Sequence, residues 1–212
     1  MVLSEQKEFK AVATDSHRMS QRKLTLENTS ANFNMVIPSK SLREFSAVFT
    51  DDIETVEVFF SDSQVLFRSD YISFYTRLLE GNYPDTDRLL TNSFETEVTF
   101  NTAALRSAME RAYLISNATQ NGTVKLEITS DSISSHVNSP EVGKVNEELD
   151  SISQSGSDLT ISFNPTYLIE ALKALKSETV MIRFISPVRP FTLMPGDDTE
   201  NFVQLITPVR TN

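Results

Sequence analysis

Side chains capable of acid–base chemistry gather in one short polar stretch near the start of the chain, at Asp15, Ser16 and His17. A carboxylate, a hydroxyl and an imidazole are the three groups of a hydrolase triad. Neighbours in sequence cannot adopt the triad geometry on one turn, however, and no nucleophile-elbow motif accompanies them. We therefore favour a recognition role for this stretch. A hydrolase-like enzyme that uses His17 and nearby acids is the alternative function.

The residues around this stretch predict a strand, a turn and a mixed polar and apolar surface. Residues 9–13 alternate in the two-residue period of a strand. Residues 15–16 are turn formers, and residues 17–19 add an imidazole, a cation and a flexible apolar tip. Residues 205–210 have a similar character of apolar side chains plus Arg. We expect these two segments, with the turn near Pro84, to form one peptide-binding pocket.

Composition indicates a globular protein and limits its chemistry. The 212 residues are enough for two small domains or one large one, with 39% hydrophobic and 23% charged residues. The absence of Cys and the presence of only two His argue against a disulfide framework, a metal site or any cofactor. No apolar run approaches the ~18 residues of a membrane span, so we expect a cytoplasmic protein without membrane contact. The net charge of -10 does not reveal where the basic residues lie.

An internal repeat organises the chain. Residues 33–42, 98–105 and 161–168 each run from an extended stretch through a capping position into an amphipathic helix. Asn101 and Asn164 are good N-caps, and Pro165 suits the first helical position. Ser39 is the expected cap of the first helix.

A second shared pattern, Thr-Val-x-apolar-x-apolar, follows each predicted helix, at residues 55–60, 123–128 and 179–184. Its alternation predicts half-buried strands that open small antiparallel meanders. The sequence thus predicts an α+β fold built from repeated strand–helix–meander units, with helices on one face and sheet on the other. Residues 91–212 contain two such units. Residues 1–90 contain one unit and the end of another, so we expect a fragment of a longer chain.

Each predicted helix carries basic residues off its apolar stripe, whereas acids are expected mainly in loops. A helix-lined basic surface would hold a phosphate backbone without sequence preference. Lys and Arg also serve solubility on ordinary amphipathic helices, and this alternative stays open. The candidate residues are Lys40, Arg43, Arg106, Arg111, Lys173 and Lys176.

Four separated motifs, at residues 12–19, 80–85, 111–117 and 207–210, give the chain a family resemblance. It resembles the bacterial beta sliding clamps, the non-enzymatic processivity subunits of replicative DNA polymerases. The resemblance implies the DNA-clamp fold, with residues 1–90 as a middle domain lacking its first strands and helix, and residues 91–212 as the C-terminal domain. It also implies a head-to-tail homodimeric ring around duplex DNA for the full-length protein.

The resemblance further implies roles for individual residues. The docking pocket for linear peptides of polymerase subunits, the clamp loader and repair proteins would use Thr14, His17, Arg18, Met19, Pro84, Arg88, Leu89, Tyr167, Val188, Pro190, Leu205, Thr207, Pro208, Val209 and Arg210. The six basic helix residues would face DNA. Contacts between subunits would use Leu114, Ile115, Glu147 and Glu148. Ser16 and Met19 depart from the family, in which Gly and Leu are common, and predict a different pocket shape.

Overall fold

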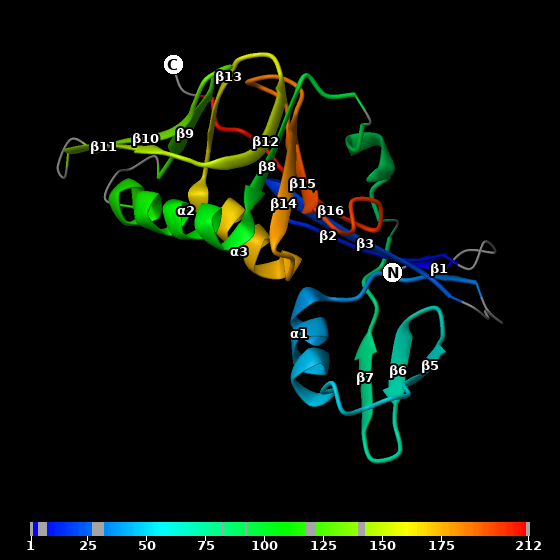
Figure 1. Ribbon diagram of the computed structural model, residues 1–212. Helices are drawn as coiled ribbons and strands as arrows, with labels where there is room; N and C mark the ends of the chain where they lie inside the picture. The colour runs from blue at the N-terminus through cyan, green and yellow to red at the C-terminus, as the bar shows by residue number, and fades with distance from the viewer. Residues whose placement is uncertain are drawn as a thin grey trace. The chain divides into compact units, whose positions relative to one another are not determined.

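The computed structural model describes residues 2–3, 8–26, 32–81, 83–91, 93–117, 122–139 and 143–210, drawn in Figure 1. The chain divides into two units. The first comprises Met1–Ala11 and Leu24–Thr86, and the second comprises Val12–Lys23 and Asp87–Asn212. The predicted polar turn at residues 15–17 thus belongs to the same unit as the end of the chain.

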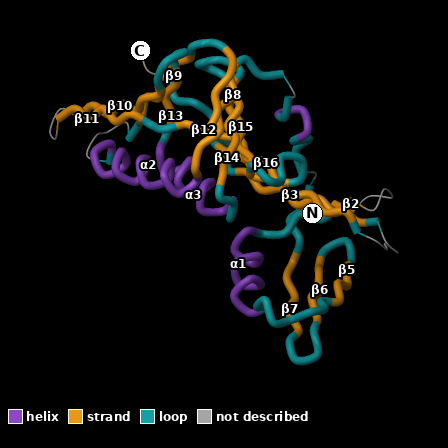
Figure 2. Tube along the Cα trace, viewed as in Figure 1, coloured by secondary structure: helices purple, strands orange, loops and turns teal. Residues whose placement is uncertain are grey.

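The second unit contains two helices and two antiparallel sheets. Helices α2 (Thr102–Ser116) and α3 (Pro165–Leu175) lie side by side beneath the strands, as Figure 2 shows. Six strands of a nine-stranded sheet follow one another in the order β12 (Ser151–Gly156), β8 (Thr96–Asn101), β14 (Thr179–Phe184), β15 (Phe191–Pro195), β16 (Phe202–Ile206) and β3 (Arg18–Thr25). The other has the order β11 (Gly143–Glu148), β10 (Ile133–Ser139), β9 (Val124–Ile128) and β13 (Leu159–Phe163).

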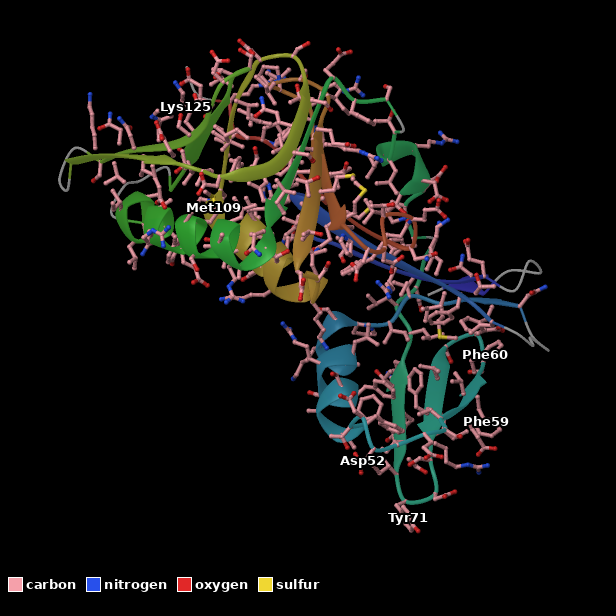
Figure 3. The ribbon with its side chains drawn as sticks, viewed as in Figure 1. Asp52, Phe59, Phe60, Tyr71, Met109 and Lys125 are labelled. Carbon is pink, nitrogen blue, oxygen red and sulfur yellow. The ribbon has the colours of Figure 1, made fainter. Side chains whose placement is uncertain are left out.

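The core of the second unit lies between these helices and sheets. Met109 of α2, labelled in Figure 3, is fully buried, as are Phe100 and Phe163 from the two sheets. Leu168 of α3 and Leu193 of β15 complete the same cluster. The apolar faces predicted for these two helices are therefore confirmed, and burial of this many large side chains is the main force that holds the unit together.

The helix starts of the second unit follow the capping prediction. The Asn101 side chain accepts a hydrogen bond from the Ala104 amide at 2.9 Å, and Asn164 accepts one from the Thr166 amide at 2.9 Å. Pro165 occupies the first turn of α3. Helix α3 ends at Lys176, which adopts the left-handed conformation with a φ of 52°.

The first unit contains helix α1 (Ser39–Val48) and a three-stranded sheet of β5 (Glu57–Phe60), β6 (Gln64–Arg68) and β7 (Ser73–Arg77). In addition, β1 (Val2–Leu3) pairs with both β2 (Glu8–Thr14) and β4 (Phe33–Asn34). Its buried cluster is small and consists of Met35, Val65 and Phe67, with Phe45 and Phe74 packed against it. The repeated strand–helix–meander plan and the α+β class predicted from the sequence are thus present.

Three local predictions for the first unit are wrong. Ser39 does not cap α1, because Pro38 holds the cap position and no side-chain cap hydrogen bond forms. The apolar stripe predicted for the first helix is not buried at Leu42, which is 37% exposed, since the small aromatic cluster of this unit does not extend to the first turns of α1. Strand β5 lies at a sheet edge with all its residues exposed, including Phe59 and Phe60 (Figure 3), so it is not half-buried.

Among the described residues, no helix combines the length and the hydropathy needed to cross a lipid bilayer. The short 3-10 helix η1 (Asp87–Leu89) begins the second of the two segments that form the second unit.

Candidate functional site

Residues 205–207, from strand β16 and the residue after it, lie beside the polar turn that precedes β3. In the antiparallel pair of β3 and β16, Met19 is the register partner of Leu205, and Arg18 is the partner of Ile206. One residue further on, the backbone N–H and the hydroxyl of Thr207 both donate to the His17 carbonyl, each at 2.9 Å. Two segments 190 positions apart in sequence therefore meet within one unit.

Local hydrogen bonds fix the turn itself. The Thr14 hydroxyl donates to the Arg18 carbonyl at 2.7 Å, and the Asp15 carboxylate accepts from the His17 amide at 3.2 Å. Ser16 has a φ of 72°, in the left-handed region that Asn, Asp and Gly adopt more readily than Ser. This turn presents the exposed ring of His17 outside the strand ladder.

The aromatic ring of Tyr167 connects α3 to this turn. The His17 and Tyr167 rings stack with centroids 5.8 Å apart and an interplanar angle of 14°. The Arg18 guanidinium lies over the same Tyr167 ring, 4.9 Å from its centroid, in cation–π geometry. Tyr167 also packs against the core, which holds the ring in place from below.

Two carboxylates hold Arg18. Its Nε donates to Asp15 at 2.8 Å, and its Nη1 donates to Glu170 of α3. Partial burial of the guanidinium opposes its charge, but the hydrogen bonds and charges of Glu170 and Asp15 raise the pKa of Arg18 above its ordinary value. Partial burial likewise opposes ionisation of Asp15, yet its bonds to Arg18 and the His17 amide lower the pKa of that carboxyl.

Sequence reasoning missed Glu170 as a site residue. It stands three positions after Tyr167, on the same face of α3, so helical spacing from a predicted site residue was the available signal. Its contact with Arg18 spans 152 positions in sequence, which pattern reading alone could not reveal.

The other predicted peptide-contacting residues of the second unit are distributed around these contacts. The Val209 amide donates to the Ser162 carbonyl at 2.7 Å, which fixes the terminal segment with the Val209 side chain exposed. Met19 is only 2% exposed and supports the surface from beneath rather than presenting an apolar tip. Pro208 and Pro190 are half-buried, and the exposed members are Arg88, Leu89, Val188 and Arg210. Pro84 belongs to the first unit.

Most of the predicted DNA-facing cations lie beside acidic residues. Lys40 is 3.9 Å from Glu44 one turn along α1. Glu110 of α2 lies 3.8 Å from Arg106 and 3.6 Å from Lys173. The helices therefore carry acids as well as bases, so the expectation that acids concentrate in loops is wrong for α1 and α2. Arg43 and Lys176 are exposed.

The four residues predicted to contact another subunit differ in their surroundings. Leu114 is 74% exposed, whereas Ile115 packs against the core of the second unit. Glu147 of β11 pairs with Arg111 of α2, and Glu148 is exposed. Arg111, which was predicted to face DNA, therefore forms an ion pair with Glu147, which was predicted to contact another subunit.

The hydrolase alternative gains no support from this geometry. The Asp15 carboxylate accepts from the His17 amide and from Arg18. In the part of the chain that the structure describes, no hydrogen bond joins that carboxylate to the His17 ring, which instead stacks on Tyr167. The acid–histidine pair of a triad is therefore not formed at this turn.

The fold is that of DNA polymerase sliding clamps. The structure superimposes on the beta subunit of the DNA polymerase of Streptococcus pyogenes with a TM-score of 0.95 and 81% identity, covering 99% of this chain and 57% of that one. For the sliding clamp of Bacillus subtilis the TM-score is 0.93 and the identity 40%, covering 100% of this chain and 56% of that one.

Sequence comparison points the same way. The models for the central and the C-terminal domain of the DNA polymerase III beta subunit match residues 1–85 and 87–210. The chain therefore belongs to the DNA polymerase III beta-subunit family. It is 71% identical over 211 residues to the beta sliding clamp of Streptococcus pneumoniae serotype 4 and 56% identical over 207 residues to that of Lactococcus lactis. The first match includes 100% of this chain and 56% of the length of the Streptococcus pneumoniae protein. The second includes 97% of this chain and 54% of the length of the Lactococcus lactis protein.

Proposed function

We propose that this chain acts within a sliding clamp that tethers a replicative DNA polymerase to duplex DNA, and that it docks linear peptides of the clamp's partners. Its relatives carry the name beta sliding clamp, and the chain spans little more than half of their length. The role is one of binding rather than catalysis, and its place is the cytoplasm.

One observation carries the docking proposal: the double hydrogen bond from Thr207 to the His17 carbonyl. It joins the polar turn to the end of the chain beside Tyr167. We call the resulting surface, made of His17, Arg18, Tyr167, Thr207 and Val209, the docking surface. Aromatic and apolar side chains next to fixed polar groups suit a peptide with Leu or Phe anchors, since anchors give affinity and polar groups give orientation.

The rest of the docking proposal extends outward from this surface. Thr14 shapes the turn, and Met19 and Leu205 support it from beneath. Further contacts to a bound peptide are proposed for Pro84, Arg88, Leu89, Val188, Pro190, Pro208 and Arg210. The peptides would come from polymerase subunits, the clamp loader and repair proteins.

The remaining assignments concern the full ring. Duplex DNA would be held loosely by Lys40, Arg43, Arg106, Arg111, Lys173 and Lys176. The head-to-tail homodimer would use Leu114, whose apolar side chain is largely exposed, with Ile115, Glu147 and Glu148 around it. Residues 1–90 and 91–212 would be the middle and C-terminal domains.

Titration with a fluorescent Gln-Leu-x-Leu-Phe peptide tests the docking proposal. We expect saturable binding in fluorescence polarisation and shifts of the His17 and Met19 signals in NMR spectra. Val209→Glu places a charge on the docking surface and should weaken binding more than tenfold, since an unpaired charge against an apolar anchor is costly. Ile152→Glu, at an exposed apolar residue of β12, is the matched control. Absence of binding, or equal binding by both variants, would refute the proposal.

A further inference from the structure

Arg18 lies between two carboxylates at the docking surface. Asp15 binds its Nε from the turn before β3, and Glu170 binds its Nη1 from the exposed face of α3. The two acids come from elements far apart in sequence and accept hydrogen bonds from different nitrogens of the guanidinium. Arg18 is therefore held in place over Tyr167 before any ligand arrives.

The two acids carry more charge than the one cation, and their side chains are more exposed to solvent. The side chain of Arg18 is 33% exposed, whereas those of Asp15 and Glu170 are 48% and 52% exposed. One positive and two negative charges leave a net negative charge at this end of the surface. Lys173, one turn beyond Glu170, does not balance it locally, because its ammonium lies 3.6 Å from Glu110.

The arrangement also determines which hydrogen bonds Arg18 has left to offer. A guanidinium has five N–H donors. Asp15 and Glu170 occupy donors on Nε and Nη1, and within the described residues Nη2 makes no hydrogen bond. Nη2 can donate to a neutral acceptor such as a peptide carbonyl, while a peptide carboxylate would have to compete with two carboxylates of the chain itself.

We infer that Asp15 and Glu170 are specificity-determining residues, which make the docking surface favour peptides carrying Lys or Arg beside the apolar anchors and disfavour those carrying Asp or Glu. This inference rests on the proposed function. It assigns Arg18 to backbone recognition instead of carboxylate capture. An acidic residue beside Tyr167 meets like charge, whereas a basic one gains two partners.

The test uses three labelled peptides that share the apolar anchors and differ only in one flanking residue, Lys, Gln or Glu, with a second set varying the opposite flank. For one of the two flanks, we expect the unsubstituted chain to bind the Lys peptide about three- to fivefold more tightly than the Glu peptide at low salt, as befits solvent-exposed ion pairs. The preference should shrink at high salt, where screening is stronger.

Glu170→Gln and Asp15→Asn should each reduce the ratio of the two dissociation constants toward one. Glu170→Asp keeps the negative charge and should retain part of the preference for the Lys peptide that Glu170→Gln loses. Glu200→Gln, in the turn before β16, makes the same change in net charge away from the site and should leave the ratio unaltered. Because the readout is a ratio, a general loss of stability or of docking geometry would not move it.

The outcomes separate the two claims. If no peptide binds the unsubstituted chain, the proposed function fails and this inference fails with it. If peptides bind but the Lys and Glu peptides bind equally at both flanks, or the preference survives in Glu170→Gln and Asp15→Asn, docking stands and the inference alone is overturned.

Discussion

The His17 carbonyl accepts two hydrogen bonds from a single residue, the N–H and the hydroxyl of Thr207. Thr207→Val preserves side-chain shape and the backbone bond but removes the hydroxyl bond. We expect it to lower the free energy of unfolding by about 0.5–1.5 kcal/mol, the net contribution of one hydrogen bond. Urea denaturation measures this. Thr160→Val, at an exposed position on β13, is the control, and equal effects of the two would contradict the role assigned to the hydroxyl.

The contribution of the Asp15 carboxyl to the free energy of unfolding should depend on pH. Partial burial raises the pKa of this carboxyl, but the hydrogen bonds from Arg18 and the His17 amide and the charge of Arg18 together outweigh it, so the pKa in the folded chain lies below the ordinary value of 3.8. A depressed folded pKa means that ionised Asp15 stabilises the fold above pH 3.8 and loses this effect as pH falls through the folded pKa. Since the side chain is half exposed, the effect at pH 7 should stay below about 1 kcal/mol.

Asp15→Asn should therefore be less stable than the unsubstituted chain at pH 7, and this deficit should narrow as the pH falls below 3.8. Urea unfolding of both proteins at several pH values measures the difference, in which titration of the other carboxyls cancels to first order. A deficit of constant size across that range would refute the assignment.

Gly156 permits a close backbone approach between β12 and β8. Its φ is 103°, and a Cβ there would lie 2.0 Å from the Glu95 carbonyl oxygen. Gly143 has a similar φ of 114° but open space around the corresponding position. Gly143→Ala should cost about 1 kcal/mol from backbone strain alone, and Gly156→Ala at least about 2 kcal/mol more because atoms collide. Thermal or urea unfolding of the two variants measures the loss in free energy of unfolding. Equal losses would show that β12 and β8 can move apart at Gly156 without an energetic cost.

Leu114 should contribute almost nothing to folding despite its position in a long helix. Its side chain is 74% exposed, whereas Leu105 of the same helix is 3% exposed. Leu114→Ala should change the free energy of unfolding by less than about 0.5 kcal/mol, and Leu105→Ala should lower it by about 2–5 kcal/mol. A large loss for Leu114→Ala would make that residue part of the core instead of an exposed contact residue.

Features determined by neighbouring residues could be predicted from the sequence. Asn101 and Asn164 cap their helices because an Asn side chain can reach the amides two or three residues later without help from the rest of the fold. The three Thr-Val strands followed from residue alternation in the same way. The buried faces of α2 and α3 were equally readable from helical spacing.

Features that depend on distant segments could not be predicted in this way. Alternation predicts which residues of β5 share a face but not whether another layer covers that face, and all four residues are exposed. Glu170 became visible as a site residue only once folding brought α3 to Arg18. Likewise, helical spacing gave Arg111 only as one of the basic helix residues predicted to face DNA, whereas the fold pairs it with Glu147.

The meeting of residues 17 and 207 has a thermodynamic consequence. Since neither segment alone presents the docking surface, an unfolded chain should have little affinity for a ligand that the folded chain recognises there. Such a ligand would raise the melting temperature by mass action, with about 2.7 kcal/mol of added stability at a hundredfold excess over its dissociation constant. Occupancy of a small surface patch would thereby reinforce the sheet that joins the two ends of the sequence.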